Sequence, residues 1–204
     1  MKFFERFLRE VKGGPWQIIM IGGPGSGKST YSKYITKHFD IPHIYTGDMM
    51  RDLAKKNTPD GKKVKELLDQ GKFAPTEIVM REVINRLKQP DARNGYVFDG
   101  FPRNMEQVRA MDKNNIEHNF IINLQVSEQE VIKRLTARGR ADDKPETIKQ
   151  RLKEHEKQVG PVIKHYEDQL INIKAEGAEP EVIANKIIKR IERWKLTTTL
   201  DFKN

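Results

Sequence analysis

The chain has 204 residues, of which 36% are hydrophobic and 33% are charged, and it contains no cysteine. A chain of this length can bury a sizeable core as one compact domain. No apolar run approaches the roughly 20 residues of a membrane-spanning helix, so we expect no stable membrane association. Disulfides and thiolate metal sites are excluded, and a cytoplasmic location is expected because a reducing compartment suits a chain without cysteine.

The chain is basic, with a net charge of +9 from 38 basic and 29 acidic residues. One interpretation of this charge is nucleic-acid binding. The basic residues are spread along helical segments, however, which favours an arginine-lined polyphosphate pocket on a lysine-rich surface. A nucleotide-dependent nucleic-acid-binding factor is kept as the alternative of a different class. No aromatic RNA-binding motif supports it, so nucleic acid is not an expected partner.

Residues 1–14 have apolar side chains at helical spacing, and Gly13, Gly14 and Pro15 follow as a stop signal. This pattern predicts a short amphipathic helix. It lacks the apolar core and the cleavage site of a secretory signal. We expect the helix to dock on the body of the protein, with membrane-surface attachment or self-association as alternatives. Either a monomer or a small homo-oligomer is compatible with the sequence.

Predicted strands alternate with predicted helices through residues 15–196. Short apolar runs typical of buried strands occupy residues 17–21, 41–45, 96–98, 119–126 and 171–174. Helical patterns occupy residues 28–38, 49–56, 62–70, 76–87, 145–158 and 180–194, and another helix starts at Ser127. This alternation predicts an α/β fold of three layers, with a central parallel sheet flanked by helices.

Three details of this prediction concern local signals. Ser127 and Glu130 have the spacing of a capping box at a helix start. Gly160 and Pro161 are expected to interrupt the long helix that begins near residue 145. Residues 197–204 are expected to form a loose tail.

The first predicted strand leads into the sequence GGPGSGKS, from Gly22 to Ser29, which then opens a helix. This is the GxxxxGK[ST] pattern in the strand–loop–helix context that it requires. Glycines allow the backbone N–H groups to wrap around phosphate oxygens, and the helix N-terminus adds partial positive charge. Lys28 would supply a cation to the β- and γ-phosphates, and the hydroxyls of Ser29 and Thr30 would lie near metal and phosphate. The motif predicts a P-loop NTPase fold.

Two further motifs follow strands, TGDMMR at residues 46–51 and DGFPR at residues 99–103. Asp99 stands where a carboxylate at the sheet end can hold a magnesium-bound water. Arg51 and Arg103 could each grip a phosphate in a bidentate manner. Further arginines follow at positions 134, 138, 140 and 151, and Asp142 and Asp143 lie among them.

The motifs GGPGSGKST, TGDMMR, DGFPR and RGRADD, in this order and spacing, resemble those of the adenylate kinase family over residues 16–194. The resemblance implies a reversible, Mg²⁺-dependent phosphoryl transfer from ATP to AMP that gives two ADP. No protein general base is implied, because the acceptor is already a phosphate anion.

The resemblance also implies a role for each matching residue. ATP is expected at Gly25, Ser26, Gly27, Lys28, Ser29, Thr30, Arg134 and Arg138. AMP is expected at Thr46, Arg51, Lys72, Phe73, Ala74, Gly100, Phe101, Pro102, Arg103, Gln107, Arg140 and Arg151. The expected catalytic residues are Lys28, Arg103, Arg138, Arg140 and Arg151. Mg²⁺ is expected at Ser29 and, through water, at Asp99, and Asp142 and Asp143 are expected to orient the lid arginines.

Thr46 and Gln107 bear on the choice of acceptor base. Relatives that phosphorylate UMP or CMP tend to carry a small residue at the first position and asparagine at the second. A glutamine can present an acceptor and a donor together to the N1 and N6 edge of adenine. AMP is therefore the expected acceptor, and a UMP/CMP kinase is the alternative within this class. The wording of residues 71–77, GKFAPTE, departs from the family's usual G-x-L-V-P-D-E.

Only Gly139 separates Arg138 from Arg140, whereas most family members carry several residues or a lid domain there. We therefore expect a minimal lid at residues 138–143 and no structural zinc. The acceptor-binding excursion, residues 46–75, would then be the main moving part.

Overall fold

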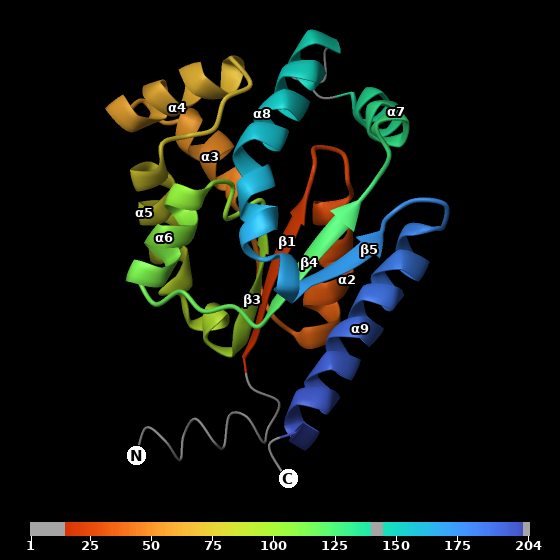
Figure 1. The fold of residues 1–204 in the computed structure, drawn as a ribbon. Helices are drawn as coiled ribbons and strands as arrows, with labels where there is room; N and C mark the ends of the chain where they lie inside the picture. The colour runs from red at the N-terminus through yellow and green to blue at the C-terminus, as the bar shows by residue number, and fades with distance from the viewer. Residues whose placement is uncertain (1–14, 140–144, 202–204) are drawn as a thin grey trace.

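A computed structural model describes residues 15–139 and 145–201 (Figure 1). The helix predicted for residues 1–14 lies outside the described residues. So do Arg140, Asp142 and Asp143, whose expected roles remain predictions.

Five parallel strands form the central sheet in the order β2-β3-β1-β4-β5. Their bounds are β1 Trp16–Gly22, β2 His43–Tyr45, β3 Gly95–Asp99, β4 Phe120–Gln125 and β5 Leu170–Lys174. Every residue of β3 is buried, as expected for a strand covered on both faces. The register places Asp99, the last residue of β3, beside Met20 of the central strand β1. The α/β fold with a parallel sheet is confirmed.

Helices cover both faces of this sheet (Figure 1). Their bounds are α2 Lys28–Phe39, α3 Thr46–Ala54, α4 Pro59–Asp69, α5 Thr76–Leu87, α6 Met105–Lys113, α7 Glu128–Arg138, α8 Pro145–His165 and α9 Pro180–Asp201. Two short 3₁₀ helices, Pro90–Asn94 and Glu167–Gln169, precede β3 and β5. Within the described ranges, no helix is long and apolar enough to cross a membrane.

The core is split between the two faces, because successive side chains of a strand point to opposite sides. On β1, Ile19 and Ile21 pack into a cluster with α3, α4, α5, α6 and α8. Ile18 and Met20 pack into the other cluster, with α2 and α9. The three predicted layers follow directly from this alternation.

The predicted interruption at Gly160 and Pro161 is wrong, because α8 runs without a break from Pro145 to His165. A proline inside a helix removes one backbone hydrogen bond. Val159 and Val162, on either side of this pair, are 4% and 0% exposed and belong to the core. Tertiary packing of this apolar face outweighs the local breaking signal.

Two further local predictions need correction. Helix α9 continues to Asp201, so residues 197–201 of the predicted tail are helical; no glycine or proline after Pro180 ends the helix earlier. Ser127 precedes α7, but its side chain makes no cap within the helix. Its hydroxyl and its backbone N–H both donate to Glu176 Oε2 at 2.9 Å, so a tertiary contact replaces the predicted capping box.

Candidate nucleotide site

A cavity of about 1080 Å³ opens where the central strands β1 and β3 end. Ligands of open parallel sheets bind at this carboxyl edge. The cavity brings together most of the predicted site residues: Gly25, Ser26, Gly27, Lys28, Ser29, Thr30, Thr46, Arg51, Lys72, Phe73, Ala74, Asp99, Gly100, Pro102, Arg103, Gln107, Arg134, Arg138 and Arg151. Phe101 is an exception. It does not line the cavity but is 1% exposed and packs against Phe98 in the core.

The phosphate loop between β1 and α2 has the backbone shape that its glycines permit. Gly25 and Gly27 have φ values of +74° and +92°, which side-chain-bearing residues rarely adopt. Helix α2 starts at Lys28 without a side-chain cap and without an acidic residue in its first turn. The open N–H groups of this helix end are a ready site for a phosphate anion.

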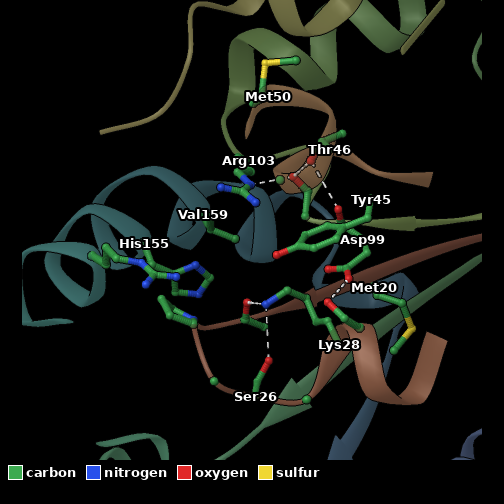
Figure 2. A pocket seen from close by; sticks show the side chains of 18 of the residues that line it. Met20, Ser26, Lys28, Tyr45, Thr46, Met50, Asp99, Arg103, His155 and Val159 are labelled. Atoms are coloured by element: carbon green, nitrogen blue, oxygen red, sulfur yellow. Dashed lines mark hydrogen bonds between the residues drawn. The ribbon is translucent and has the colours of Figure 1, made fainter. Parts of the chain in front are cut away.

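Lys28 lies over the loop that precedes it, and its Nζ donates to the carbonyls of Gly22 and Gly23 at 2.6 and 2.8 Å. Burial lowers the pKa of Lys28 to about 8, with further lowering by Arg103, Arg151 and Arg138 and an opposing effect of Asp99. Figure 2 shows Lys28, Asp99, Arg103 and His155 around one space. An added negative charge, such as that of a bound phosphate, would therefore stabilise the protonated form of Lys28.

This lowered pKa predicts that ATP binding is linked to proton uptake. Phosphate charge favours the ammonium form, so binding should raise the pKa of Lys28. At about pH 6.5 the amine is already protonated and uptake by Lys28 should be near zero, whereas at about pH 8.5 it should reach about three quarters of a proton per ATP. Titration calorimetry in buffers of different ionisation enthalpy measures this number. Equal uptake at both pH values, or full uptake in Lys28→Met, would contradict the assignment.

Asp99 is 0% exposed, and both of its hydrogen bonds fall on one carboxylate oxygen. The Ser29 hydroxyl donates to Oδ2 at 2.5 Å, and His43 Nε2 lies 3.1 Å from the same atom. Burial alone would raise the pKa of Asp99, but His43, Lys28 and Ser29 together lower it. The carboxylate therefore stays charged at neutral pH.

The other oxygen of this carboxylate, Asp99 Oδ1, is buried without a hydrogen-bond partner among the described residues. A buried carboxylate oxygen in need of a partner, beside the Ser29 hydroxyl, fits a hard cation such as Mg²⁺ and its bound water. No group of three or more His, Cys, Asp or Glu side chains suited to a metal occurs in the described ranges. A magnesium ion here would thus depend mainly on water and nucleotide phosphates, as this ion usually does.

His43 was missed in the sequence analysis. It stands two residues before Tyr45, which pairs with Asp99 in the register of β2 and β3. A polar residue at the start of a short strand was the available signal, but the pairing of this strand with the one before DGFPR had to be known to use it.

Hydrogen bonds connect four predicted acceptor-side residues around the loop after β3. The Thr46 hydroxyl donates to the carbonyl of Gly100 at 2.7 Å, and Arg103 Nε donates to the same carbonyl at 2.6 Å. The backbone N–H of Arg103 donates to Gln107 Oε1 at 2.7 Å. Gln107, 1% exposed, is therefore held by the loop that carries Arg103.

Gln107 lies on α6, a helix that the sequence analysis did not predict. The side chain of Asn104 caps it by accepting the N–H of Gln107 at 2.8 Å. An asparagine before a run with apolar residues at 105, 108 and 111 was the signal that could have revealed this helix.

The opposite wall of the cavity comes from α7 and α8. Arg134 is fixed by two bonds, from Nε to Glu130 Oε1 at 2.8 Å and from Nη2 to the Ala175 carbonyl at 2.9 Å. Helix α7 ends at Arg138, and Gly139 follows with φ +64°. His155 of α8 also lines the cavity, and burial with the charges of Lys28 and Arg103 lowers its pKa to about 3. This imidazole, which the sequence analysis missed, is neutral at physiological pH.

This concentration of fixed positive charge can neutralise a phosphoryl group that moves between two bound phosphates, and phosphoryl transfer needs little else from a protein. The fold and the cavity thus define a phosphotransferase of the P-loop class. A family model described as "Adenylate kinase" matches residues 20–171. The chain belongs to the adenylate kinase family.

Curated relatives agree over most of the chain. An adenylate kinase of Corynebacterium diphtheriae is 39% identical over 175 residues, which cover 84% of this chain and 97% of that protein. One of Corynebacterium aurimucosum is 40% identical and covers 81% of this chain and 94% of that protein. One of Lachnospira eligens is 35% identical, with coverages of 80% and 93%.

Proposed function

We propose that the chain transfers the γ-phosphoryl group of Mg²⁺-bound ATP to AMP and, in reverse, makes ATP and AMP from two ADP. The observation that carries this proposal is the shared cavity of the phosphate loop and the DGFPR loop, in which Arg103 is close enough to Lys28 to lower the pKa of the lysine. Membership of the adenylate kinase family supports the reaction.

In this mechanism the protein positions and neutralises charge rather than attacking the substrate. The phosphate loop and the start of α2 bind the donor phosphates, and Lys28 leaves the carbonyls of Gly22 and Gly23 to contact them. Arg51 and Arg103 bind the acceptor phosphate, and Arg138 and Arg151 stabilise the group in transfer. When bound, Mg²⁺ held by Ser29 and by water on Asp99 would neutralise phosphate charge. Proton transfer is not needed, because the attacking oxygen is already ionised.

Gln107 is proposed to read the acceptor base. Its oxygen already accepts the N–H of Arg103, and an amide oxygen has a second lone pair for the N6 amino group of adenine. Its NH₂ group could donate to N1. A UMP/CMP kinase remains the alternative acceptor assignment. The two assignments differ because the edge of a pyrimidine base presents a different pattern of hydrogen-bond donors and acceptors to Gln107.

Gln107→Asn tests the base assignment. The shorter side chain cannot hold the Arg103 N–H and reach the base together, so discrimination should fall more than the rate. We expect the preference for AMP over CMP, as a ratio of kcat/KM values, to fall by about tenfold to a hundredfold. The kcat for AMP should fall less than this ratio in a steady-state assay. Gln129→Asn, at an exposed position on α7, is the control. An unchanged ratio would contradict the assigned role.

The reverse reaction tests the proposed function most simply. The purified chain is incubated with ADP and Mg²⁺ alone, and the nucleotides are separated by chromatography. Equal amounts of ATP and AMP should appear. Formation of AMP and phosphate without ATP would instead indicate a hydrolase.

A further inference from the structure

Each of the two acceptor-side arginines lies on an aromatic ring. The guanidinium carbon of Arg103 is 4.9 Å from the ring centroid of Phe73, and that of Arg51 is 5.1 Å from the ring centroid of Tyr45. All four residues line the cavity. Both distances are within the roughly 6 Å over which a ring face attracts a cation. The ring of Phe73, which stands in the segment that departs from the family wording, has no role in the function proposed above.

Arg103 also lies close to the backbone of Gly100. The φ of Gly100 is +74°, and a Cβ built there would lie 2.5 Å from Nη2 of Arg103. The guanidinium thus occupies space that a side chain at position 100 would take, while its Nε donates to the Gly100 carbonyl at 2.6 Å. Phe73 and the bare backbone of Gly100 together confine the guanidinium.

The backbone that carries Phe73 is itself fixed. Helix α4 ends in a turn at Gly71, φ +71°, where Gly71 and Lys72 donate their N–H groups to Leu68 and Leu67 at 2.9 Å. This pair of bonds is the Schellman pattern of a helix C-terminus. Phe73 follows at once and packs against the larger core cluster. The ring is therefore a rigid support rather than a passing contact.

Arg103 needs such a support because its surroundings oppose its charge. Burial lowers the pKa of Arg103; Tyr45 and Asp99 act against this, and the charges of Arg151 and Arg51 add to the lowering. No carboxylate in the described part of the chain forms an ion pair with Arg103. Before the acceptor binds, burial without a carboxylate partner favours displacement of the guanidinium toward solvent. The negative face of an aromatic ring opposes this displacement.

We propose that Phe73 is a positioning residue for the acceptor phosphate: its ring holds the Arg103 guanidinium in the binding geometry before AMP arrives. This inference rests on the proposed function. Tyr45 lies under Arg51 in a similar way, but Asp48 also holds Arg51 through an ion pair, so the proposal is confined to Phe73. An arginine that is already ordered loses less freedom when it binds a phosphate, so the ring contributes to AMP affinity. Once AMP is bound, its phosphate holds Arg103, and the chemical step depends much less on the ring.

Phe73→Leu and Phe73→Tyr test the proposal, because leucine keeps the apolar packing without a π face and tyrosine keeps both. Calorimetric titration of the free protein with AMP should give a Kd about fivefold to tenfold higher for Phe73→Leu and within about twofold of wild type for Phe73→Tyr. The KM for ATP and kcat should change by less than about twofold in Phe73→Leu. Phe39→Leu removes a ring that packs on Trp16, and it should leave the AMP Kd unchanged.

A double-mutant cycle shows whether Phe73 acts through Arg103. Phe73→Leu should weaken AMP binding in the wild-type chain but have no further effect in Arg103→Ala. The same loss in both backgrounds, or wild-type affinity in Phe73→Leu, would overturn the proposal. Failure of Phe73→Tyr to restore affinity would also overturn it. If the wild-type chain neither binds nor phosphorylates AMP, the proposed function is overturned as well. This result differs from a failure of the Phe73 proposal alone, in which the wild-type chain still binds and phosphorylates AMP.

Discussion

Lys28→Ala is expected to lower kcat for ATP and AMP by about a thousandfold or more, the largest effect of any single change here. Lys28 carries the only ammonium group that the phosphate loop itself supplies. Of the other cations that line the described cavity, Lys33 stands further along α2 and the rest stand on different elements. The native fold should persist. The folded environment lowers the pKa of Lys28, so this charge is held in place at a cost in stability.

Steady-state kinetics and a thermal unfolding curve measure the two halves of this prediction. Lys37→Ala, at an exposed position in the last turn of the same helix, is the matched control and should keep full activity. A Lys28→Ala protein that retains more than about a tenth of the wild-type kcat would show that the lysine is not the proposed phosphate contact, and an unfolded protein would contradict the prediction that the fold persists.

Arg103→Ala should have the second largest effect, a fall in kcat/KM for AMP of about a hundredfold to a thousandfold. The removed guanidinium is a partly buried charge that we propose to contact the acceptor phosphate, and no nearby lysine can reproduce its planar, bidentate geometry. ATP is proposed to bind at the phosphate loop, which is a separate element of the cavity. Its Kd should therefore change by less than about threefold.

The two affinities are measured separately, by titration with AMP and with a non-hydrolysable ATP analogue. Arg109→Ala, an exposed arginine on α6, controls for loss of general positive charge. If Arg103→Ala weakened the ATP analogue as much as AMP, Arg103 would belong to the donor side and the acceptor assignment would fail.

Sequence reasoning reached the fold and the phosphate loop because both are local signals. Ile18, Ile19 and Met20 form a continuous apolar run that suits a strand buried on both faces. Gly25 and Gly27 indicate a loop whose positive φ values favour glycine. The order of the strands cannot be read in this way, since it depends on which runs pair. The contact of His43 with Asp99 could not be predicted without knowing that strand order.

The errors have the same origin. Pro161 sits inside a continuous helix because the neighbouring valines are buried, and Ser127 leaves its cap for Glu176, which is 49 residues away in the chain. Phe101 belongs to a site motif but packs into the core. Phe73 was expected to contact AMP, and its ring lies on Arg103. Each case depends on a tertiary neighbour, which neither propensity nor motif spacing records.

We propose that this site transfers a phosphoryl group from ATP to AMP in preference to other monophosphates. The most direct test is a coupled assay with ATP, Mg²⁺ and AMP, CMP, UMP or GMP in turn, run beside a control without acceptor. We expect rapid ADP formation with AMP, much slower formation with the other three, and almost no ATP hydrolysis in the control. A preference for CMP or UMP would contradict the role of Gln107, and hydrolysis without acceptor at a comparable rate would contradict a transferase.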